Sequence, residues 1–313
     1  MEIQFLKNPR FDFLGKAKYF VGLSLVLILA GVAHMTTRGV RYGVEFSGGT
    51  QLIARFQNAP EVDKIRGAVE AVSPGAVIQS YDAPAKNQVL IRLSATGDKE
   101  LSDVARDVLK GLGSSYAANP VVESSTEIVG PVVGAELRQK AVNLTLFGLL
   151  FQLVYIAWRF NGAVWGAAAT VAVLHDVLVS LGLLAFFGYE ITLNVIAALL
   201  TLVGYSVNDT IVIFDRVREN LRQRRKEPLA TIINDSVNQT LSRTLISNGT
   251  TFLTVLGLFV FGGEVLRGFS FTMVVGIVVG TYSTIYIASP LVVWWESRRR
   301  GAGAGSATAR AAL

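Results

Sequence analysis

The chain has 313 residues, of which 51% are hydrophobic and 17% are charged, and its mean hydropathy is +0.46. This composition is outside the globular range and excludes a soluble enzyme. Because the chain has no cysteine, disulfide scaffolds, thiolate zinc sites, haem-attachment motifs and cysteine nucleophiles are excluded as well. The net charge is +6, and the distribution of the basic residues indicates orientation in a membrane rather than nucleic-acid binding.

Six apolar stretches are long enough to cross a bilayer core of about 30 Å, which requires about 20 helical residues. They are residues 19–37, 141–158, 160–189, 191–214, 244–263 and 268–295. Lys and Arg cluster before the first stretch, after the fourth and after the sixth, so we expect six crossings with both termini in the cytoplasm. The first stretch is too long for a signal peptide and no cleavage site follows it, which favours an uncleaved anchor. The basic clusters are expected to contact membrane lipid and not nucleic acid.

Residues 1–18 are predicted to form a cytoplasmic segment, and residues 19–37 the first span. Between this span and the second one, residues 38–138 alternate strand and helix patterns. Strands are predicted at 50–56, 76–82, 87–93 and about 120–129, and helices at 60–72 and about 99–112. This βαββαβ order predicts a ferredoxin-like α+β domain, with a hairpin turn at 82–87 and an extra strand at 40–46. On the predicted orientation the domain lies outside the cytoplasm.

Residues 139–296 are predicted to form a five-helix bundle, because short links join most of the remaining spans. The interval 215–243 is amphipathic, and we expect it to lie along the cytoplasmic surface of the membrane. Residues 297–313 are predicted to be a flexible cytoplasmic tail.

An ionisable side chain at the centre of a membrane helix costs about 2.5–3.5 kcal/mol, so such residues are candidates for function. Asp209 lies in the fourth span, about 9 Å inward from Asp215 at a rise of about 1.5 Å per residue. Arg243, at the start of the fifth span, is expected at a similar depth. Because the two helices run antiparallel, Asp209 and Arg243 can face each other.

Polar residues recur at helical spacing in three of the spans. They are Asn194, Thr201, Tyr205 and Asn208 in the fourth span, Thr240, Thr244, Asn248 and Thr251 in the fifth, and His175, Asp176 and Ser180 in the third. Such groups either hold helices together or line an ion or proton route. We favour the route for Asp209 with Arg243, and leave both interpretations open for His175 and Asp176.

Asp209 suits proton carriage, because burial favours the neutral form of a carboxyl group and a nearby guanidinium favours the charged form. Arg243 keeps its own proton and is expected to act as counter-charge and gate, with Asn208 beside the pathway. Gly276 and Gly280 form a GxxxG pair that indicates close helix packing. With two histidines in the chain, we expect no metal site.

Four segments carry a resemblance to a known family. They are GYSVNDTIVIFDRVREN (204–220), LHDVLVSLGLLAFFGYEITLNVIAALLTLV (174–203), YGVEFSGGTQL (42–52) and SRTLISNGTTFLTVLGLFVFGG (242–263). These segments closely resemble the SecF subunits of the SecD/SecF family of bacterial protein-export machinery. The resemblance extends over essentially the whole chain up to about residue 296.

The resemblance implies an α-helical polytopic protein of the bacterial inner membrane, in which a six-helix RND-type bundle carries the extracytoplasmic ferredoxin-like domain. It further implies partnership with SecD and use of the proton-motive force to help draw preproteins from the SecYEG channel. The family's membrane acid falls on Asp209, its arginine on Arg243 and its His-Asp pair on His175 and Asp176. A family signature falls on Glu45, Phe46, Gly48 and Gly49, with Glu where Asp is also common, and we interpret it as a turn that needs two glycines.

Two other classes of function stay open from the residues alone. One is a small-molecule or lipid exporter half of the RND superfamily, and the other is a purely structural assembly factor. The chain has no Walker phosphate loop or other nucleotide fingerprint, so we expect neither a cofactor nor an enzymatic activity. The absence of an internal inverted repeat indicates that a partner supplies the other half of the transporter.

Overall fold

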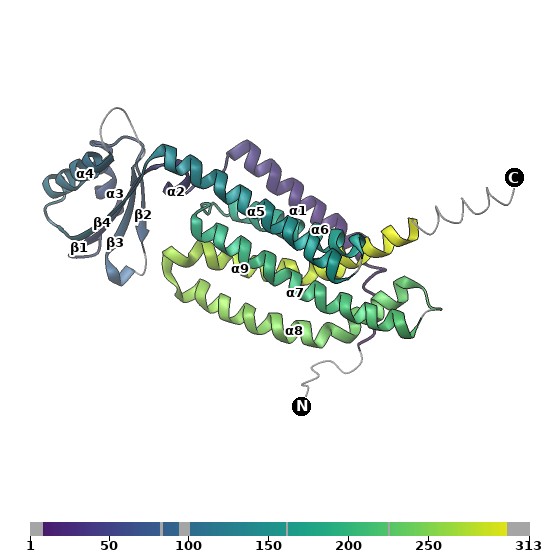
Figure 1. Cartoon of the computed structure of the whole chain (residues 1–313). Coiled ribbons are helices and arrows are strands. Elements are labelled where there is room, and N and C mark those ends of the chain that lie inside the picture. Colours follow the sequence, from purple (N-terminus) through teal and green to yellow (C-terminus); the bar gives the residue numbers. More distant parts are fainter. Residues whose placement is uncertain (1–8, 82–83, 94–100, 161, 225, 299–313) are drawn as a thin grey trace.

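The computed structural model describes residues 9–81, 84–93, 101–160, 162–224 and 226–298. An α+β domain lies at one end of a long helical bundle, and both ends of the described chain lie at the other end (Figure 1). The predicted tail falls outside the described residues from position 299 onward, as does part of the predicted turn at 82–87.

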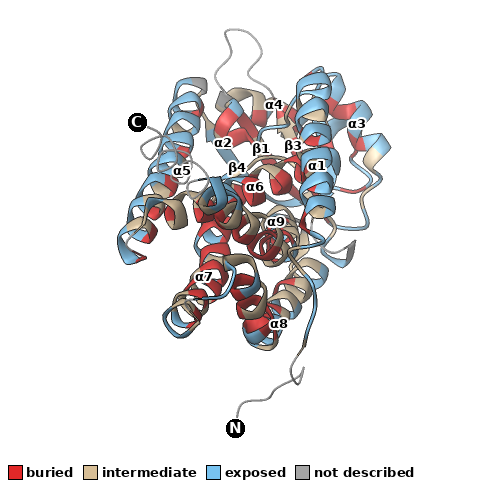
Figure 2. Ribbon diagram, turned by 90° about the vertical axis from the view of Figure 1, so that its right-hand side faces the viewer, coloured by how far each residue is buried: buried red, intermediate tan, exposed pale blue. Residues whose placement is uncertain are grey.

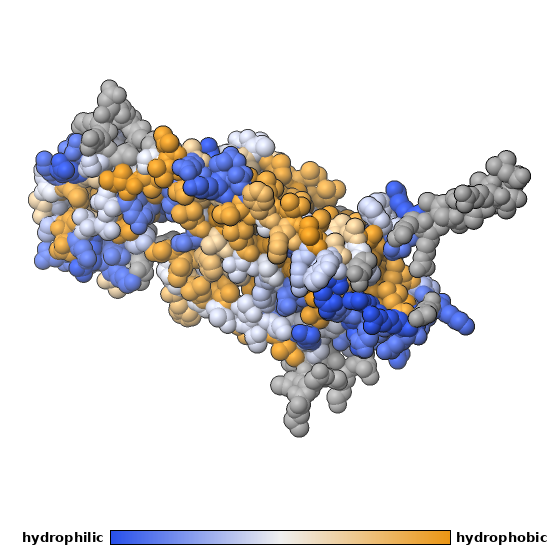
Figure 3. All heavy atoms as spheres, in the orientation of Figure 1, coloured by the Kyte–Doolittle hydropathy of each residue, from blue (hydrophilic) through white to orange (hydrophobic). Residues whose placement is uncertain are grey.

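Within the described residues, six helices are long and apolar enough to cross a membrane, so the chain is a multi-pass membrane protein. They are α1 (Ala17–Arg38), α5 (Pro131–Arg159), α6 (Ala163–Phe186), α7 (Leu193–Gln223), α8 (Leu229–Phe261) and α9 (Gly263–Ser283). After α9 the helix continues through a π-helical turn, η2 (Thr284–Ala288), to Arg298. On the face shown in Figure 3, much of the bundle surface is hydrophobic, with paler side chains among it, and hydrophilic side chains gather at the end away from the α+β domain.

Helices α6, α7 and α9 form the centre of the bundle, whereas α1, α5 and α8 are mostly exposed (Figure 2). Small residues permit the close approaches. A Cβ atom at Gly31 of α1 would lie 2.8 Å from the Cα of Gly182 in α6, and one at Gly276 would lie 2.6 Å from the side chain of Leu202 in α7. The pair predicted for packing, Gly276 and Gly280, therefore faces α7, where Gly280 lies against Ser206.

The α+β domain has the predicted βαββαβ order. Its strands are β1 (Gly49–Phe56), β2 (Val77–Tyr81), β3 (Gln88–Leu93) and β4 (Val121–Val129), with the short turn η1 (Pro84–Lys86) between β2 and β3. They form one antiparallel sheet in the order β2-β3-β1-β4, and helices α3 (Val62–Glu70) and α4 (Leu101–Ser115) pack on one face of it. Alternate residues of β1 point into this core, as a half-buried strand requires. The ferredoxin-like fold is thus confirmed.

Two predictions about local structure are wrong. The strand expected at 40–46 is absent from this described segment, where Tyr42 makes one parallel bridge to Ile191 and a short helix, α2 (Val44–Ser47), follows. The separate surface segment expected at 215–243 does not form either. Instead α7 and α8 continue as regular helices beyond their apolar parts and meet in a turn, so that the interval is a helical hairpin. An amphipathic pattern fits this hairpin because one side of each helix packs against the other.

The α+β domain contacts the bundle at the turn between α6 and α7. Arg92 of β3 forms an ion pair with Glu190 in this turn, and both side chains are largely buried. Burial lowers the pKa of the Arg92 guanidinium, and the negative charge of Glu45 opposes that shift. The domain is therefore attached by a charged contact as well as by the chain itself.

Candidate functional site

Asp209 belongs to a buried polar cluster that joins three helices, and we call Tyr205, Asp209, Asn248 and Thr281 the Asp209 cluster. Tyr205 and Asp209 are four residues apart on α7 and therefore lie on one face of that helix. Asn248 of α8 donates hydrogen bonds from Nδ2 to the Asp209 carboxylate and to Oγ1 of Thr281 in α9, the latter at 2.7 Å. Its Oδ1 accepts a hydrogen bond of 2.9 Å from the Tyr205 hydroxyl.

Arg243 and Asn208 lie beside this cluster on the surface of the bundle. Arg243 is close enough to act electrostatically on the Asp209 carboxylate, but the two side chains do not form a salt bridge within the described residues. Both Arg243 and Asn208 are exposed, whereas Asp209 is buried. The direct partner of the carboxylate is thus Asn248, and the guanidinium is a nearby, solvent- or partner-facing charge.

A second polar cluster surrounds Asp176, and we define the Asp176 cluster as Ser24, His175, Asp176, Ser206, Tyr282 and Ser283. Oδ2 of Asp176 accepts hydrogen bonds from Ser206 (2.6 Å) and Ser283 (2.9 Å). Its Oδ1 lies 2.9 Å from Nδ1 of His175. The carboxylate is fully buried, so these three contacts replace the water that it would otherwise require.

A chain of hydrogen bonds leads from the Asp176 carboxylate to α1. Nε2 of His175 lies 3.0 Å from the Tyr282 hydroxyl, which lies 2.8 Å from Oγ of Ser24. If Nδ1 of His175 carries the proton and donates it to Asp176, Nε2 is free to accept from Tyr282, and Tyr282 to accept from Ser24. All donors in the chain then point toward the buried carboxylate.

The two clusters meet along α7 and α9 without sharing a side chain. In α9, Thr281 contacts the Asp209 cluster, and the next residues, Tyr282 and Ser283, contact the Asp176 cluster. The π-helical turn begins directly afterwards, and its first residue, Thr284, lies 3.1 Å from the hydroxyl of Thr210. A π turn is a local irregularity that is frequent at functional positions of helices. The arrangement suits groups that exchange a proton or an ion within a low-dielectric bundle.

The described residues contain no group of three or more His, Asp or Glu side chains that could hold a metal ion. The chemistry on view is therefore that of carboxylates, hydroxyls, an imidazole and a guanidinium. The carboxylates and the imidazole can take up and release protons, whereas the guanidinium keeps its proton.

Comparison with known proteins assigns the family. The model of the family "Protein export membrane protein SecD/SecF, C-terminal" matches residues 110–298, and that of the "SecD/SecF GG Motif" matches residues 35–60. The protein translocase subunit SecF of Calditerrivibrio nitroreducens is 41% identical over 95% of this chain and 98% of its own length. The chain belongs to the SecD/SecF family. The SecF of Desulfurispirillum indicum is 39% identical and covers 95% of both chains.

Solved structures of the SecD/SecF family share the fold. The crystal structure of SecDF from Thermus thermophilus matches with a TM-score of 0.80 and 39% identity, over 95% of this chain and 40% of that one. SecDF in the super-membrane-facing form matches with a TM-score of 0.72 at the same identity. This chain thus spans about two fifths of those SecDF chains, and within the family it has a SecF-like role in protein export.

The GG motif of the SecD/SecF family lies where the chain leaves the bundle for the α+β domain. Gly48 and Gly49 have φ values of 72° and 134°, which residues with a Cβ rarely adopt, and Phe46 is buried. A Cβ at Gly134, in the first turns of α5, would lie 3.0 Å from the backbone nitrogen of Gly48. Glu45 and its neighbours therefore form a tight turn packed against the start of α5. None of these residues belongs to either polar cluster.

Several members of the clusters were not selected by the sequence pattern. Ser206, Tyr282 and Ser283 are ordinary in membrane helices, where small polar residues usually serve packing. Whether Ser206 of α7 and Tyr282 and Ser283 of α9 face the His175–Asp176 pair depends on how α6, α7 and α9 are rotated about their axes, which no periodicity of a single helix specifies. Asn248 belonged to the predicted polar stripe of the fifth span, but its pairing with Asp209 was not predicted, because the sequence indicated Arg243 as the partner of this acid.

Proposed function

We propose that the chain is the SecF-like subunit of a bacterial preprotein translocase in the cytoplasmic (inner) membrane. In this proposal it pairs with SecD, uses the proton-motive force, and assists late steps of export of preproteins through the SecYEG channel. The observation that carries the proposal is an exposed polar stripe on the membrane-spanning surface beside Asp209.

This stripe of exposed polar side chains runs along α7 and α8, and lipid would disfavour Asn208 and Arg243 most, since the threonine hydroxyls bond to carbonyls of their own helices. Its members are Thr201, Asn208, Arg243, Ser247, Thr250 and Thr254. A charged residue at such a position costs about 2.5–3.5 kcal/mol on insertion scales, and a facing protein removes that cost. The SecDF chains extend well beyond the part that this chain covers, which supports a SecD-like half as the covering partner.

The orientation follows from the charged ends of the bundle. The hairpin between α7 and α8 carries Arg216, Arg218, Arg222, Arg224 and Lys226, whereas the turn between α6 and α7 carries none. In this proposal the hairpin and both termini lie in the cytoplasm and the α+β domain on the opposite side, as the positive-inside rule favours. There the domain is positioned to contact a preprotein that emerges from the channel.

Asp209 is the proposed proton carrier in this mechanism. It is the buried acid that adjoins the partner-facing stripe, and Asn248 holds its carboxylate toward α9. Movement of the exposed Arg243 toward or away from the carboxylate would change which form of Asp209 is favoured. The Asp176 cluster, which includes His175, shares helices α7 and α9 with the Asp209 cluster. In this proposal a change in the protonation of Asp209 is transmitted through the Asp176 cluster to α1.

The test is potential-driven release of a preprotein from membrane vesicles that contain this chain together with SecD and SecYEG. Asp209→Asn keeps the shape of the side chain, so we expect normal assembly with SecD and loss of the stimulation by the potential. The matched control is Asp215→Asn, which removes an acid of the same helix that forms a 3.1 Å salt bridge with Arg159 outside the cluster. That variant should retain stimulation.

Three results would redirect the proposal. Normal release by Asp209→Asn would remove the carrier role from this acid. Stimulation that persists without any potential would indicate a structural assembly factor. Failure of SecD to copurify with the chain, combined with uptake of small amphiphiles by the vesicles, would indicate an exporter half.

A further inference from the structure

A pocket of about 490 Å³ lies between the end of α1 and the turn that joins α6 to α7. Two features build it. The contact between Gly31 and Gly182 brings α1 and α6 together on one side of the pocket. Further along, the chain segments pair again, because the backbone N–H of Ile191 donates to the carbonyl of Arg41 at 2.8 Å. The pocket is thus enclosed between a helix crossing and a backbone bridge.

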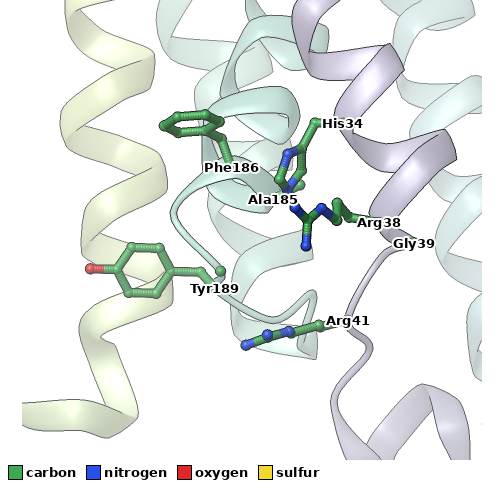
Figure 4. A pocket seen from close by; sticks show the side chains of 8 residues that line it. His34, Arg38, Gly39, Arg41, Ala185, Phe186 and Tyr189 are labelled. Carbon is green, nitrogen blue, oxygen red and sulfur yellow. The ribbon is translucent and has the colours of Figure 1, made fainter.

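The pocket is basic, and neither of its arginines has an ion pair within the described part of the chain. His34, Arg38 and Arg41 line it together with Phe186, Gly188 and Tyr189, and its lining contains no Asp or Glu. Figure 4 shows both arginines reaching from the α1 side toward the turn after α6. Neither Arg38 nor Arg41 has an ion pair or a side-chain hydrogen bond with another described residue, although both are available at the surface. The nearby Glu190 is engaged by Arg92.

The pocket also lies at the level of a membrane surface. Helix α1 has 22 residues and spans about 33 Å, so Arg38, its last residue, lies near the edge of a hydrocarbon core of about 30 Å. Apolar surface adjoins the pocket, since Phe186, which lines it, is 63% exposed. The ring of His34 packs edge-on against that of Phe186, with 5.6 Å between the ring centroids, and the pair marks the membrane side of the pocket.

We propose that this pocket binds the phosphate of an anionic phospholipid from the leaflet next to the α+β domain. A planar guanidinium matches phosphate oxygens in a forked geometry, and two of them converge on the pocket. The exposed apolar surface of α1 and α6 accepts the acyl chains, which a soluble phosphate compound does not have. A lipid held by Arg38 and Arg41 links the end of α1 to the α6–α7 turn, where the α+β domain is attached.

The experiment measures lipid binding by the purified full chain in neutral detergent. Phosphatidylglycerol, phosphatidylcholine and inorganic phosphate are titrated at equal phosphorus concentrations, and binding is followed by the rise in Tm and by native mass spectrometry. Wild type should bind phosphatidylglycerol more tightly than phosphatidylcholine and should not respond to phosphate alone. R38Q/R41Q should lose at least about tenfold in affinity, because it lacks two charge-assisted hydrogen bonds.

The matched control is R218Q/R222Q, which removes the same charge at the opposite end of the bundle and should bind phosphatidylglycerol like wild type. Equal affinity of R38Q/R41Q and this control would overturn the proposal. Equal binding of phosphatidylcholine would remove the requirement for negative charge, and full protection by inorganic phosphate would identify a soluble anion as the occupant. If R38Q/R41Q does not fold, R41Q alone and the charge-preserving R38K/R41K decide the same question. R41Q should bind more weakly than wild type, and R38K/R41K should bind more tightly than R41Q but less tightly than wild type, because lysine keeps the charge and lacks the planar fork.

Discussion

The ion pair between Arg92 and Glu190 should control how firmly the α+β domain is held on the bundle. Its side chains are 17% and 20% exposed, so each would be left as a poorly solvated charge if its partner were removed. Breaking a fully buried pair costs about 3–5 kcal/mol. Because water still reaches this pair, we expect Arg92→Leu or Glu190→Leu to cost about 2 kcal/mol, which lowers the ratio of docked to undocked domain about thirtyfold.

Removing both partners should cost far less than the two single changes together. Nε of Arg92 and Oε2 of Glu190 are buried without hydrogen-bond partners, and each unsatisfied group costs about 1 kcal/mol or more. The pair therefore contributes little net stability, and the double leucine variant should lie within about 1 kcal/mol of wild type. The expected coupling energy is about 3 kcal/mol.

The assay is single-molecule energy transfer in nanodiscs between a dye on the α+β domain and one on the bundle. The chain has no cysteine, so cysteines introduced at the exposed positions Ser114 and Phe261 can be labelled without other changes. Each single variant should show a larger undocked population, and the double variant should resemble wild type. Strictly additive effects would refute the reasoning, because they would show that the two charges do not compensate each other.

Three further predictions concern the domain, the helix packing and the polar cluster. The fragment of residues 38–135 should fold alone and give dispersed amide signals in solution NMR, because its core is formed by its own sheet and two helices; a collapsed spectrum would contradict an autonomous domain. Gly31→Ala should destabilise the chain by about 1–3 kcal/mol, since its Cβ would meet the backbone of Gly182 at 2.8 Å, whereas Gly204→Ala, with open space around it, should be neutral or slightly stabilising; equal melting temperatures would refute the close crossing. Asp209→Asn and Arg243→Ala should be non-additive in potential-driven preprotein release, with Arg243→Lys a partial rescue, and additive losses would place the partner of Asp209 in another subunit.

The sequence predicted those features that depend on the periodicity of single segments. Apolar runs of about 20 residues located the spans, and alternating runs such as TQLIARF located the strands of the α+β domain. The sequence did not predict the parts of α7 and α8 beyond their apolar runs, because contacts between the two helices extend them. The hairpin between α7 and α8 is closed by Arg224, which pairs with Glu227 and Asp235, and such pairing keeps both helices regular outside their apolar parts.

The candidate site shows the same boundary. The depth of each residue along two antiparallel helices predicted that Asp209 and Arg243 lie near each other. The rise per residue gives only this depth and does not say in which direction a side chain points. Rotation about each helix axis decides which side chain makes the contact, and here it directs Asn248 to the carboxylate and leaves Arg243 exposed. Rotation is set by packing of small residues such as Gly276 against Leu202, which involves two helices at once.

The N-terminal segment before α1 gives the bundle a mechanical linkage. Asn234 and Asn238, at the start of α8, hold the backbone of this segment. The N–H of Phe11 donates to Asn238 and that of Phe13 to Asn234, each at 2.9 Å, and both asparagines donate to the carbonyl of Phe11. Helix α8 is a rod of about 50 Å that also carries Asn248, and α1 leads from the clamped segment to the α+β domain. A tilt of α8 would therefore be transmitted to the start of α1 through these hydrogen bonds. Helices α8 and α1 thus form one connected path from the level of the buried acid to the start of the α+β domain.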